Sequence, residues 1–583
     1  MLHNLMASRD TERDVHALDR LIHLVSSRFT RGISPAALSL AYADWWLHLA
    51  MYPGKQLDLA EDAVTRAARL AMYSARCMMG GGDELCVEPA PDDNRFRSPE
   101  WHQWPFNVIH QNFLLTQQWW ERATREVRGM EPHHQEVVHF VGRQLLDVFS
   151  PSNYIATNPQ VLRHTWEQGG ENLLRGWTHW VEDMDRQMRG LPPVGTERWQ
   201  VGKNLALTPG KVVYRNRLIE LIQYEPTTKR VHPEPVLCIP AWIMKYYILD
   251  LAPGKSLVEY LRDQGHTVFM VSWKNPDAND RELGMDDYRR LGIMAALDAV
   301  GTIVPDRPVH AVGYCLGGTL LSLAASAMAR DDDARLASMT VFAGQVDFTE
   351  PGELDLFIDQ SQVTYLEDVM AQVGYLEAYQ MAAAFQLLRS QDLIWSQVVH
   401  DYLMGERTQV IDLMAWNADA TRLPYRMHSE YLRRLFLNND FVEGRYDIDG
   451  QPVHFGDIDV PIFAVGTVKD HVAPWASVYK INRLARTEVT FLLTTGGHNA
   501  GIITPPGHPR RKYQVRIRQA HERYIPSEAF RREQPYHQGS WWPEWQRWLA
   551  ERSSSTVAPP PMGAPDRGYP VSGDAPGEYV LQA

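Results

Sequence analysis

The sequence predicts an α/β protein with a doubly wound, mostly parallel sheet, and three observations lead to this fold class. From about residue 205 onward, short apolar and β-branched runs alternate with helical stretches. Several runs are almost entirely apolar, as expected for parallel strands covered on both faces. One run leads directly into the five residues 313–317, Gly-Tyr-Cys-Leu-Gly, which place a cysteine between a strand and a helix. This alternation is typical of a doubly wound sheet.

Seven apolar runs are the expected strands. In chain order they span residues 211–214, 235–240, 267–273, 309–314, 339–343, 461–466 and 489–493. Between about 348 and 455 the apolar residues show helical spacing, and no convincing strand is found. An insertion of this size between two core strands usually forms a lid over an active site. We therefore expect a catalytic domain over 201–553 that contains a helical lid at about 348–455.

The regions on either side of this domain differ from it in composition. Residues 1–200 predict a mainly helical N-terminal domain, because segments such as 36–46 and 140–147 carry apolar residues at three- and four-residue spacing. The acidic, proline-containing stretch 88–93 is a loop that divides this region. Residues 554–583 are a proline- and glycine-rich tail with a composition typical of disordered segments.

Length, cysteine content and charge limit the possible functions. At 583 residues the chain exceeds the usual ceiling for one hydrophobic core. Four scattered cysteines are too few for a disulfide framework, and Cys77 and Cys86 have no partners at zinc-ligand spacing. A reducing, cytoplasmic compartment fits this pattern, and we expect neither a metal nor a cofactor. The net charge of −13 argues against a general nucleic-acid binder.

Local charged residues bear on a substrate site and on targeting signals. An anionic substrate would need a local basic patch, for which residues 510–512, Arg-Arg-Lys, are one candidate; the alternative is a solvated charge run. Residues 1–10 reach a charged residue before any apolar stretch of signal-peptide length, so we expect no export signal. No apolar run approaches the length of a membrane span.

The turn at 313–317 carries the chemistry. In the α/β-hydrolase fold a Gly-x-nucleophile-x-Gly turn links a buried strand to a helix, with the nucleophile at its strained tip. Here the nucleophile is Cys315, and the next amide, that of Leu316, would face the oxyanion formed during acyl transfer. A second oxyanion donor should come from the loop after an early strand, and Ile243 is the candidate. Cysteine in place of serine indicates thioester chemistry; the alternative is a buried, inert cysteine.

An activated cysteine needs a base, and the base needs an acid to orient it. In this fold the chain order is nucleophile, acid, histidine, with the acid and the histidine on loops after late strands. Asp470 follows the run 461–466 and His498 follows the run 489–493, so both stand in the expected order after Cys315. Asp347 is the rival acid and His471 the rival base.

Tryptophan is abundant and clusters in two places, Trp101, Trp104, Trp119 and Trp120 in one and Trp541, Trp542, Trp545 and Trp548 in the other. The second cluster has helical spacing. Packing of a helix onto the core is the simpler interpretation. The alternative is an amphipathic surface that meets a hydrophobic phase.

Over nearly its whole length the chain resembles the single-subunit polyhydroxyalkanoate synthases. The matching segments are residues 151–159, 204–213, 245–251, 265–269, 313–318, 416–421, 540–543 and 575–580. By this resemblance Cys315, Asp470 and His498 match the family's triad. The resemblance implies polymerisation of (R)-3-hydroxyacyl-coenzyme A into a storage polyester with release of coenzyme A. It also implies a homodimer at the surface of cytoplasmic polymer granules, with phasin-type granule proteins as further partners.

Two residues depart from the family pattern. Met244 replaces an asparagine in the loop that usually reads Trp-Ile-Asn-Lys-Tyr-Tyr, and Asn499 stands where the family often has isoleucine. Both bear on substrate preference rather than on the reaction. Length and the long N-terminal region most resemble the enzymes that prefer short-chain monomers.

The expected mechanism has two activation steps. His498 takes the proton of Cys315, whose thiolate attacks the thioester; the monomer's 3-hydroxyl is activated later by Asp470, directly or through His498. A cysteine-dependent thioesterase would use the same three residues and pass the acyl group to water. A non-enzymatic granule-associated protein would need no triad. A cysteine protease fits least well, because the order of the three residues on this sheet is that of a hydrolase.

Overall fold

The computed structural model of the protein describes residues 11–80, 84–91 and 93–583. These residues divide into two compact units. We call them the sheet unit, which comprises the chain up to Phe29, Gly195–Ala382 and Val410–Ala583, and the helical unit, which comprises Thr30–Val194 and Ala383–Gln409. The expectation about an export signal concerns residues 1–10 and lies outside the described residues. Within the described residues, no helix is both long and apolar enough to cross a membrane.

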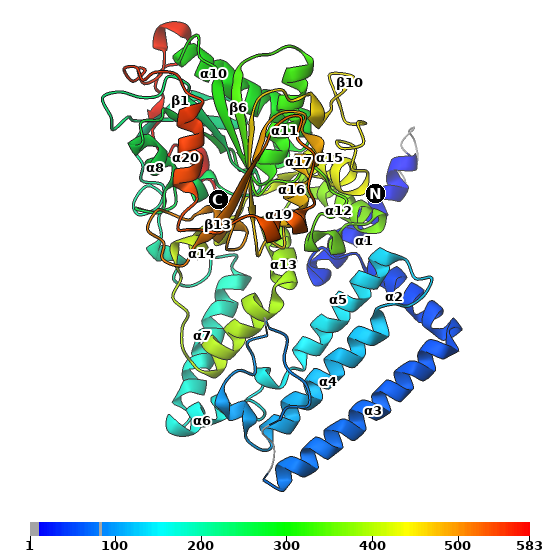
Figure 1. The fold of residues 1–583 in the computed structure, drawn as a ribbon. Helices are drawn as coiled ribbons and strands as arrows, with labels where there is room; N and C mark the ends of the chain where they lie inside the picture. The colour runs from blue at the N-terminus through cyan, green and yellow to red at the C-terminus, as the bar shows by residue number, and fades with distance from the viewer. Residues whose placement is uncertain (1–10, 81–83, 92) are drawn as a thin grey trace, which may run out of the picture. The chain divides into compact units, whose positions relative to one another are not determined.

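An eleven-stranded sheet forms the centre of the sheet unit, counted over the described residues, and confirms the predicted fold class (Figure 1). From one edge to the other its strands are β14 (His537–Gln538), β13 (Lys512–Arg518), β12 (Val489–Thr494), β11 (Ile462–Thr467), β6 (Leu336–Phe342), β5 (Val309–Tyr314), β3 (Val236–Ile239), β4 (Val268–Trp273), β2 (Ile219–Tyr224), β1 (Gly210–Arg215) and β15 (Gly573–Asp574). The central strands from β12 to β4 are parallel, and the strands outside them are antiparallel.

Alternate residues of the buried strands pack into two separate cores, one on each face of the sheet. In β3, Leu237 and Ile239 belong to one core, while Val236 and Cys238 belong to the other. The first face is covered by α9 (Met285–Asp287), α10 (Ala295–Ile303), α11 (Leu316–Arg330), α16 (Trp475–Tyr479), α17 (Ile481–Leu484) and α19 (Ser527–Glu533). The second is covered by α8 (Leu257–Asp263), α18 (His498–Ile502) and α20 (Trp542–Glu551). Because apolar side chains are needed on both faces, the central strands appear in the sequence as continuous apolar runs.

Two long strands were not predicted, and both carry polar residues. Strand β2 contains the buried side chains of Glu220 and Gln223. Glu220 accepts hydrogen bonds from the amides of Glu578 and Tyr579, both at 2.9 Å, and pairs with Arg215. The partners therefore make this buried carboxylate tolerable. Strand β13 contains polar residues between apolar ones, and the buried side chains of Gln514 and Arg518 donate to backbone carbonyls.

The predicted lid region contributes no strand to the main sheet in the described structure. Its helices are α12 (Gln360–Val373), α13 (Ala378–Leu388), α14 (Asp412–Ala418) and α15 (Tyr425–Tyr431). The strand pairs β7 (Tyr375–Leu376) with β8 (Leu423–Pro424) and β9 (Asp447–Ile448) with β10 (Gln451–Pro452) form two small separate sheets. Residues 383–409 group with the helical unit, so the lid of the sheet unit consists of the segments on either side of them.

The tail after Ser553 is ordered, contrary to the expectation from its composition. Its strand β15 pairs with β1 through Lys211–Asp574 and Val212–Gly573, and Val580 is buried. The buried carboxylate of Glu220 supplies the acceptors that hold the backbone of residues 578 and 579. A low-complexity composition does not prevent order when the sheet edge and a buried acceptor provide partners for the backbone.

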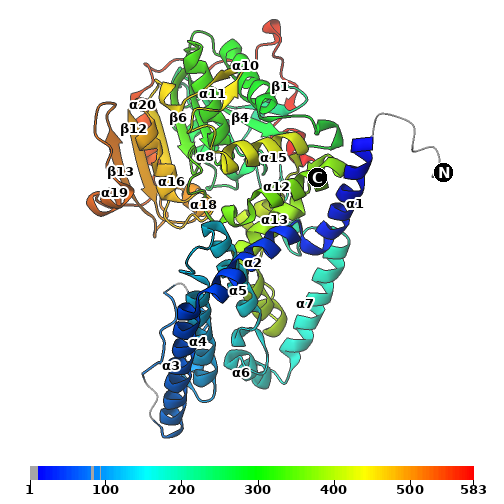
Figure 2. The same ribbon diagram turned by 90° about the vertical axis from the view of Figure 1, so that its right-hand side faces the viewer.

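Over the residues that the structure describes, six α-helices form most of the helical unit, together with residues 383–409 (Figure 2). They are α2 (Pro35–Met51), α3 (Pro53–Met78), α4 (Phe106–Thr124), α5 (Pro132–Val148), α6 (Pro159–Glu167) and α7 (Glu171–Met188). Residues 383–409 are held against α7, because the side chains of Arg407 and Tyr402 both donate to the carboxylate of Asp183, at 2.7 and 3.0 Å. Helix α1 (Thr11–Thr30) belongs to the sheet unit as far as Phe29. Its His23 is hydrogen-bonded to Asp368 of α12 at 2.8 Å. The domain limits expected from the sequence, 1–200, 201–553 and 554–583, stay predictions.

The second tryptophan cluster is part of the core, which confirms the simpler interpretation and shows that the alternative, an amphipathic surface, was wrong. Trp541, Trp542, Trp545 and Trp548 are at most 4% exposed. Three of their indole N–H groups have acceptors: that of Trp541 binds the carbonyl of Gly501, that of Trp542 binds the carbonyl of Ile502 and that of Trp545 binds Thr340. In the first cluster Trp101 is fully buried, whereas Trp104 is 59% exposed.

Candidate active site

Cys315 lies at the tip of the turn between β5 and α11, in the middle of the sheet. Its φ of 54° and ψ of −124° place it in a conformation that is strained for a residue with a side chain. Its amide donates to the carbonyl of Phe342 at 2.8 Å, which fixes the turn to β6. The side chain is half-buried. A strained residue at the carboxyl end of a central strand has the geometry of a nucleophile elbow.

The two glycines of the turn are required by close backbone approaches. A β-carbon on Gly313 would lie 2.4 Å from the Cα of Gly318, and one on Gly317 would lie 2.1 Å from the carbonyl oxygen of Ile239. Both distances are far below van der Waals contact. The second approach also places the loop that follows β3, residues 240–245, directly against the first turn of α11.

The start of α11 leaves two amides next to Cys315. The amides of Gly318 and Thr319 donate to the carbonyl of Cys315 at 2.8 and 3.3 Å. Those of Leu316 and Gly317 precede the first intrahelical acceptor, as the first amides of any helix do. The helix N-terminus also carries a partial positive charge, which stabilises an anion there. Leu316 thus has the position expected of an oxyanion donor.

His498 and Asp470 form a buried pair. The Nδ1 atom of His498 and the Oδ2 atom of Asp470 are 2.8 Å apart. Asp470 also accepts from the hydroxyl of Thr467 at 3.0 Å and, through Oδ1, from the amides of Val472 and Ala473 at 3.0 and 2.8 Å. Burial would raise the pKa of the Asp470 carboxyl, but His498 and these donors hold it below its usual value. The carboxylate is therefore ionised, and its lone pairs are occupied.

The surroundings of this pair also shift the pKa of the His498 imidazole. Burial would lower the pKa of His498, but the charge of Asp470, the nearby Cys315 and hydrogen bonds to both raise it well above its usual value. A histidine oriented by a carboxylate beside a cysteine can take the proton of the thiol. The arrangement can therefore supply the base that a cysteine nucleophile needs.

The rival acid and base of the sequence analysis have other contacts. The carboxylate of Asp347 accepts from the amide and the hydroxyl of Thr349, at 2.9 and 2.8 Å, and from Asn439 at 3.1 Å. Its Oδ2 atom lies 3.7 Å from the ammonium of Lys480. Between the two candidate histidines, the one hydrogen-bonded to Asp470 is His498.

Asn499, one of the two departures from the family pattern, has a partner in Tyr314. The buried Tyr314 hydroxyl donates to the Oδ1 atom of Asn499 at 2.5 Å, and its ring stacks on that of His498 with centroids 5.7 Å apart. The hydrogen bond links the residue before the nucleophile to the residue after the histidine. Sequence reasoning noted Asn499 but missed Tyr314, because nothing in the chain indicates that the two residues meet.

In the basic run at 510–512, Arg511 holds the loop that carries His498. Arg511 donates to the carbonyl of Thr495 at 3.1 Å and to that of Ala500 at 2.7 Å, which lie on either side of His498. Burial lowers the pKa of this guanidinium. Arg511 therefore braces the histidine loop, and this accounts for it better than solvation alone; Arg510 and Lys512 are exposed.

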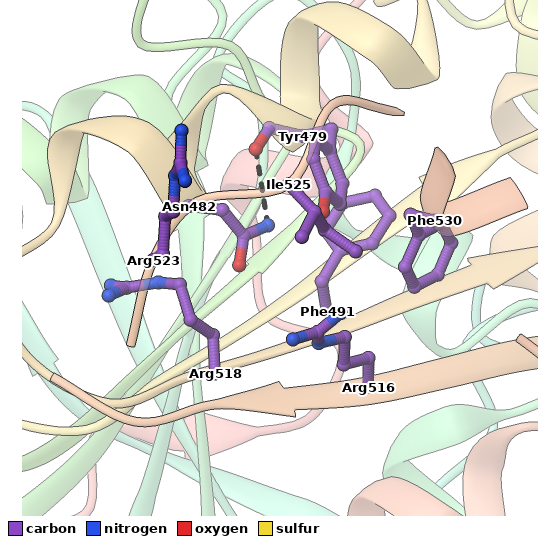
Figure 3. A pocket seen from close by; sticks show the side chains of 8 residues that line it. All are labelled: Tyr479, Asn482, Phe491, Arg516, Arg518, Arg523, Ile525 and Phe530. Atoms are coloured by element: carbon purple, nitrogen blue, oxygen red, sulfur yellow. Dashed lines mark hydrogen bonds between the residues drawn. The ribbon is translucent and has the colours of Figure 1, made fainter. Parts of the chain in front are cut away.

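A depression in the sheet unit is lined by other residues (Figure 3). It is lined by Tyr479, Asn482, Phe491, Arg516, Arg518, Arg523, Ile525 and Phe530. Arg518 pairs with Val489 at the amino end of β12, whereas His498 follows the carboxyl end of that strand. The Arg518 guanidinium already donates to the carbonyls of Ala485 and Thr487, both at 2.9 Å. We therefore do not assign the substrate to this depression.

Comparison with known families matches three models to this chain. Residues 13–55 match "Poly-beta-hydroxybutyrate polymerase N terminal", and residues 92–261 match "Poly-beta-hydroxybutyrate polymerase (PhaC) N-terminus". Residues 234–504 match the alpha/beta hydrolase fold, in agreement with the sheet and the turn at Cys315. A monoacylglycerol lipase structure from Paleococcus ferrophilus superposes with a TM-score of 0.31 at 12% identity over 57% of this chain and 99% of the lipase, a likeness too weak to argue from.

Curated relatives are similar over most of their own length. The "Poly(3-hydroxyalkanoate) polymerase" of Methylorubrum extorquens is 41% identical over 92% of this chain and 88% of the relative. The "Poly(3-hydroxyalkanoate) polymerase subunit PhaC" of Cupriavidus necator is 34% identical over 84% and 83%, and "Poly(3-hydroxyalkanoate) polymerase 1" of Ectopseudomonas oleovorans 31% over 90% and 94%. With this identity over nearly its full length, and with a nucleophile elbow on the expected sheet, the chain belongs to the poly(3-hydroxyalkanoate) polymerase family.

Proposed function

We propose that this protein polymerises (R)-3-hydroxyacyl-coenzyme A into poly(3-hydroxyalkanoate) and releases coenzyme A, with Cys315 as the acylated residue. Polymerase activity follows from the family to which the chain belongs. The observation that carries the mechanism is the strained, half-buried Cys315 beside His498, whose pKa is raised by a buried carboxylate. A preference for short-chain monomers is part of the proposal and rests on the length of the chain and its N-terminal region.

In the first step Cys315 is acylated. The thiolate of Cys315 attacks the thioester carbonyl, so that a carbon–sulfur bond forms and the carbonyl oxygen becomes an oxyanion. The amides of Leu316 and of the loop after β3 stabilise this oxyanion. The bond to the coenzyme A sulfur then breaks, and the leaving thiolate takes the proton held by His498. The products are acyl-Cys315, free coenzyme A and a neutral His498.

In the second step the chain grows. The 3-hydroxyl oxygen of a further monomer attacks the carbonyl of acyl-Cys315, its proton passes to His498, and the bond to the Cys315 sulfur breaks. The lengthened chain, a coenzyme A thioester, can acylate Cys315 again. Asp470 acts through His498 rather than directly, because its lone pairs are occupied and its pKa is lowered.

A thioesterase with the same residues would differ only in passing the acyl group to water. Exclusion of water is therefore part of the proposed function, and the lid is the segment that would provide it. Tyr431 of α15 supports this role: burial, and in addition the nearby Cys315, raise its pKa well above the usual value. The lid thus contributes a buried side chain close to the nucleophile.

The partners and location are proposed from family membership. A homodimer on cytoplasmic polymer granules, with phasin-type proteins beside it, fits a chain whose four cysteines are all free. The buried tryptophans of α20 are not the granule contact. A non-enzymatic granule protein would not need the pair of His498 and Asp470.

The experiment incubates the pure protein with 3-hydroxybutyryl- and 3-hydroxydecanoyl-coenzyme A and measures thiol release and polymer separately. We expect polymer and coenzyme A together, faster with the shorter substrate. The matched control is Cys77→Ala, which removes another partly buried thiol and should keep full activity. Thiol release without polymer would identify a thioesterase and contradict the proposal.

A further inference from the structure

A short segment of the lid, residues 416–422, is hydrogen-bonded to the loop that follows β3. The hydroxyl of Thr421 donates to the carbonyl of Trp242 at 2.9 Å, and the amide of Thr421 donates to the carbonyl of Ile243 at 3.4 Å. Met244 and Ala420 form an isolated antiparallel bridge beside these bonds. The lid segment and the loop therefore lie side by side.

These bonds determine the orientation of the Ile243 amide. The carbonyl of Trp242 and the N–H of Ile243 belong to one trans peptide group, in which they point in opposite directions. Since the carbonyl points toward the Thr421 hydroxyl, the N–H points away from the lid segment. Within the described residues, no backbone carbonyl accepts a hydrogen bond from this N–H. It is thus available to a ligand.

The same loop is already placed at the nucleophile. It continues from the carboxyl end of β3, the neighbour of β5 in the sheet. Gly317 lies so close to Ile239 and Pro240 that an added β-carbon would be 2.1 and 2.7 Å from their carbonyl oxygens. The loop therefore meets the first turn of α11, where the amide of Leu316 lies.

We propose that Thr421 is a positioning residue for the oxyanion hole: its hydroxyl holds the Trp242–Ile243 peptide so that the Ile243 amide faces the reacting carbonyl. The inference rests on the proposed function. Thr421 is 3% exposed, and both its hydroxyl and its amide donate to the loop. Acylation of Cys315 therefore depends on a lid residue through the loop.

An ion pair between the buried Lys245 and the half-buried Asp419 keeps the lid segment in place. The ammonium of Lys245 lies 2.8 Å from Asp419 and donates to the carbonyl of Gln582 at 2.7 Å. Tyr247 donates to the other oxygen of Asp419 at 2.9 Å. Asp419 lies two residues before Thr421, and Lys245 two residues after Ile243. The contact is thus fastened on the side of the loop that follows the peptide oriented by Thr421.

The test compares Thr421→Val, which removes the hydroxyl and keeps the shape, with Thr421→Ser, which keeps the hydroxyl. The matched control is Thr364→Val, which removes an exposed hydroxyl from α12 of the same lid. For each protein, kcat and KM are measured with 3-hydroxybutyryl-coenzyme A. The rate of Cys315 alkylation by iodoacetamide is measured in parallel, because alkylation needs the thiolate but forms no oxyanion.

We expect Thr421→Val to lower kcat about tenfold to a hundredfold, somewhat less than the loss of a whole oxyanion donor. KM and the alkylation rate should stay near those of the unaltered protein, and Thr421→Ser and Thr364→Val should keep kcat. Unchanged kcat in Thr421→Val would overturn the inference, as would an equal fall in kcat and alkylation. Where Thr421→Val does not fold, Thr421→Ala serves in its place.

Failure of the proposed function would look different. If alkylation of Cys315 left acyl transfer by the unaltered protein intact, Cys315 would not be the nucleophile, whatever the Thr421 variants did.

Discussion

The two halves of the candidate site are held by different parts of the sheet unit. Cys315 and His498 are fixed by the sheet and its flanking loops, through the bond of Cys315 to Phe342, the Asp470 carboxylate and the brace from Arg511. The loop with Ile243 is held by the lid, through Thr421. The difference implies that formation of the thiolate is independent of the lid, whereas stabilisation of the oxyanion depends on it.

The strongest effect is expected at the nucleophile, which belongs to the half held by the sheet. Cys315→Ala should abolish polymerisation, a loss of at least about a thousandfold, because no other group can accept the acyl chain. Steady-state coenzyme A release and polymer mass measure it. Cys77→Ala is the control, and appreciable polymer from Cys315→Ala would show that another residue carries the acyl group.

The next largest effect separates the two chemical steps. Asp470→Asn keeps the size of the side chain and removes its charge. Because a cysteine–histidine pair can ionise without a carboxylate, one equivalent of coenzyme A should still be released, while polymerisation falls by at least about a hundredfold. Single-turnover coenzyme A release is compared with steady-state polymerisation. An equal fall in both would show that Asp470 serves acylation and chain growth alike, which would contradict the separation of the two steps.

Much of this arrangement is predictable from the sequence. The parts that are not predictable depend on contacts between residues far apart in the chain. Seven strands are visible because both of their faces are buried. Strand β2 is not, since the partners of Glu220 come from residues 578 and 579, more than 350 positions away. The order of Cys315, Asp470 and His498 is likewise predictable, whereas the bond from Thr421 to Trp242 joins residues 179 positions apart.

The free energy of unfolding should depend on pH through the pair of His498 and Asp470. The pKa of His498 is raised in the folded protein, so its contribution is fully present below about pH 6.5 and is lost as the pH rises through the folded pKa. The pKa of Asp470 is lowered, so its contribution is present above its unfolded pKa and is lost as the pH falls through the folded pKa.

Urea unfolding of the unaltered protein and of Asp470→Asn measures this dependence. Without the carboxylate His498 loses the main cause of its raised pKa, so the stability difference between the two proteins should be larger at pH 6 than at pH 9. A difference that grows with pH over this range would contradict the assigned charges.

The smallest effect is expected for the hydrogen bond between Tyr314 and Asn499. Tyr314→Phe removes the hydroxyl and keeps the ring on His498, so the free energy of unfolding should fall by only about 0.5–1.5 kcal/mol. Asn499→Leu should add little to this loss in the double variant, since both changes remove the same bond. Thermal or urea unfolding of the four proteins provides the cycle. Fully additive losses would show that the two side chains act separately.

The lid-dependent half also predicts an order of proteolysis. The lid segments on either side of residues 383–409 should be cut before the sheet in limited digestion, and a non-hydrolysable substrate analogue should protect them. The rate of cutting is followed by mass spectrometry with and without the analogue. Equal resistance of lid and sheet in both conditions would argue against a lid that opens.

The central claim is that Cys315 carries the acyl group during polymerisation. The most direct measurement mixes Asp470→Asn with 3-hydroxybutyryl-coenzyme A, quenches the mixture in acid and maps the acylated peptide by mass spectrometry. The account predicts about one acyl group per chain, on Cys315, in step with released coenzyme A. Coenzyme A released with no acyl group on Cys315, or with the acyl group on another residue, would contradict it.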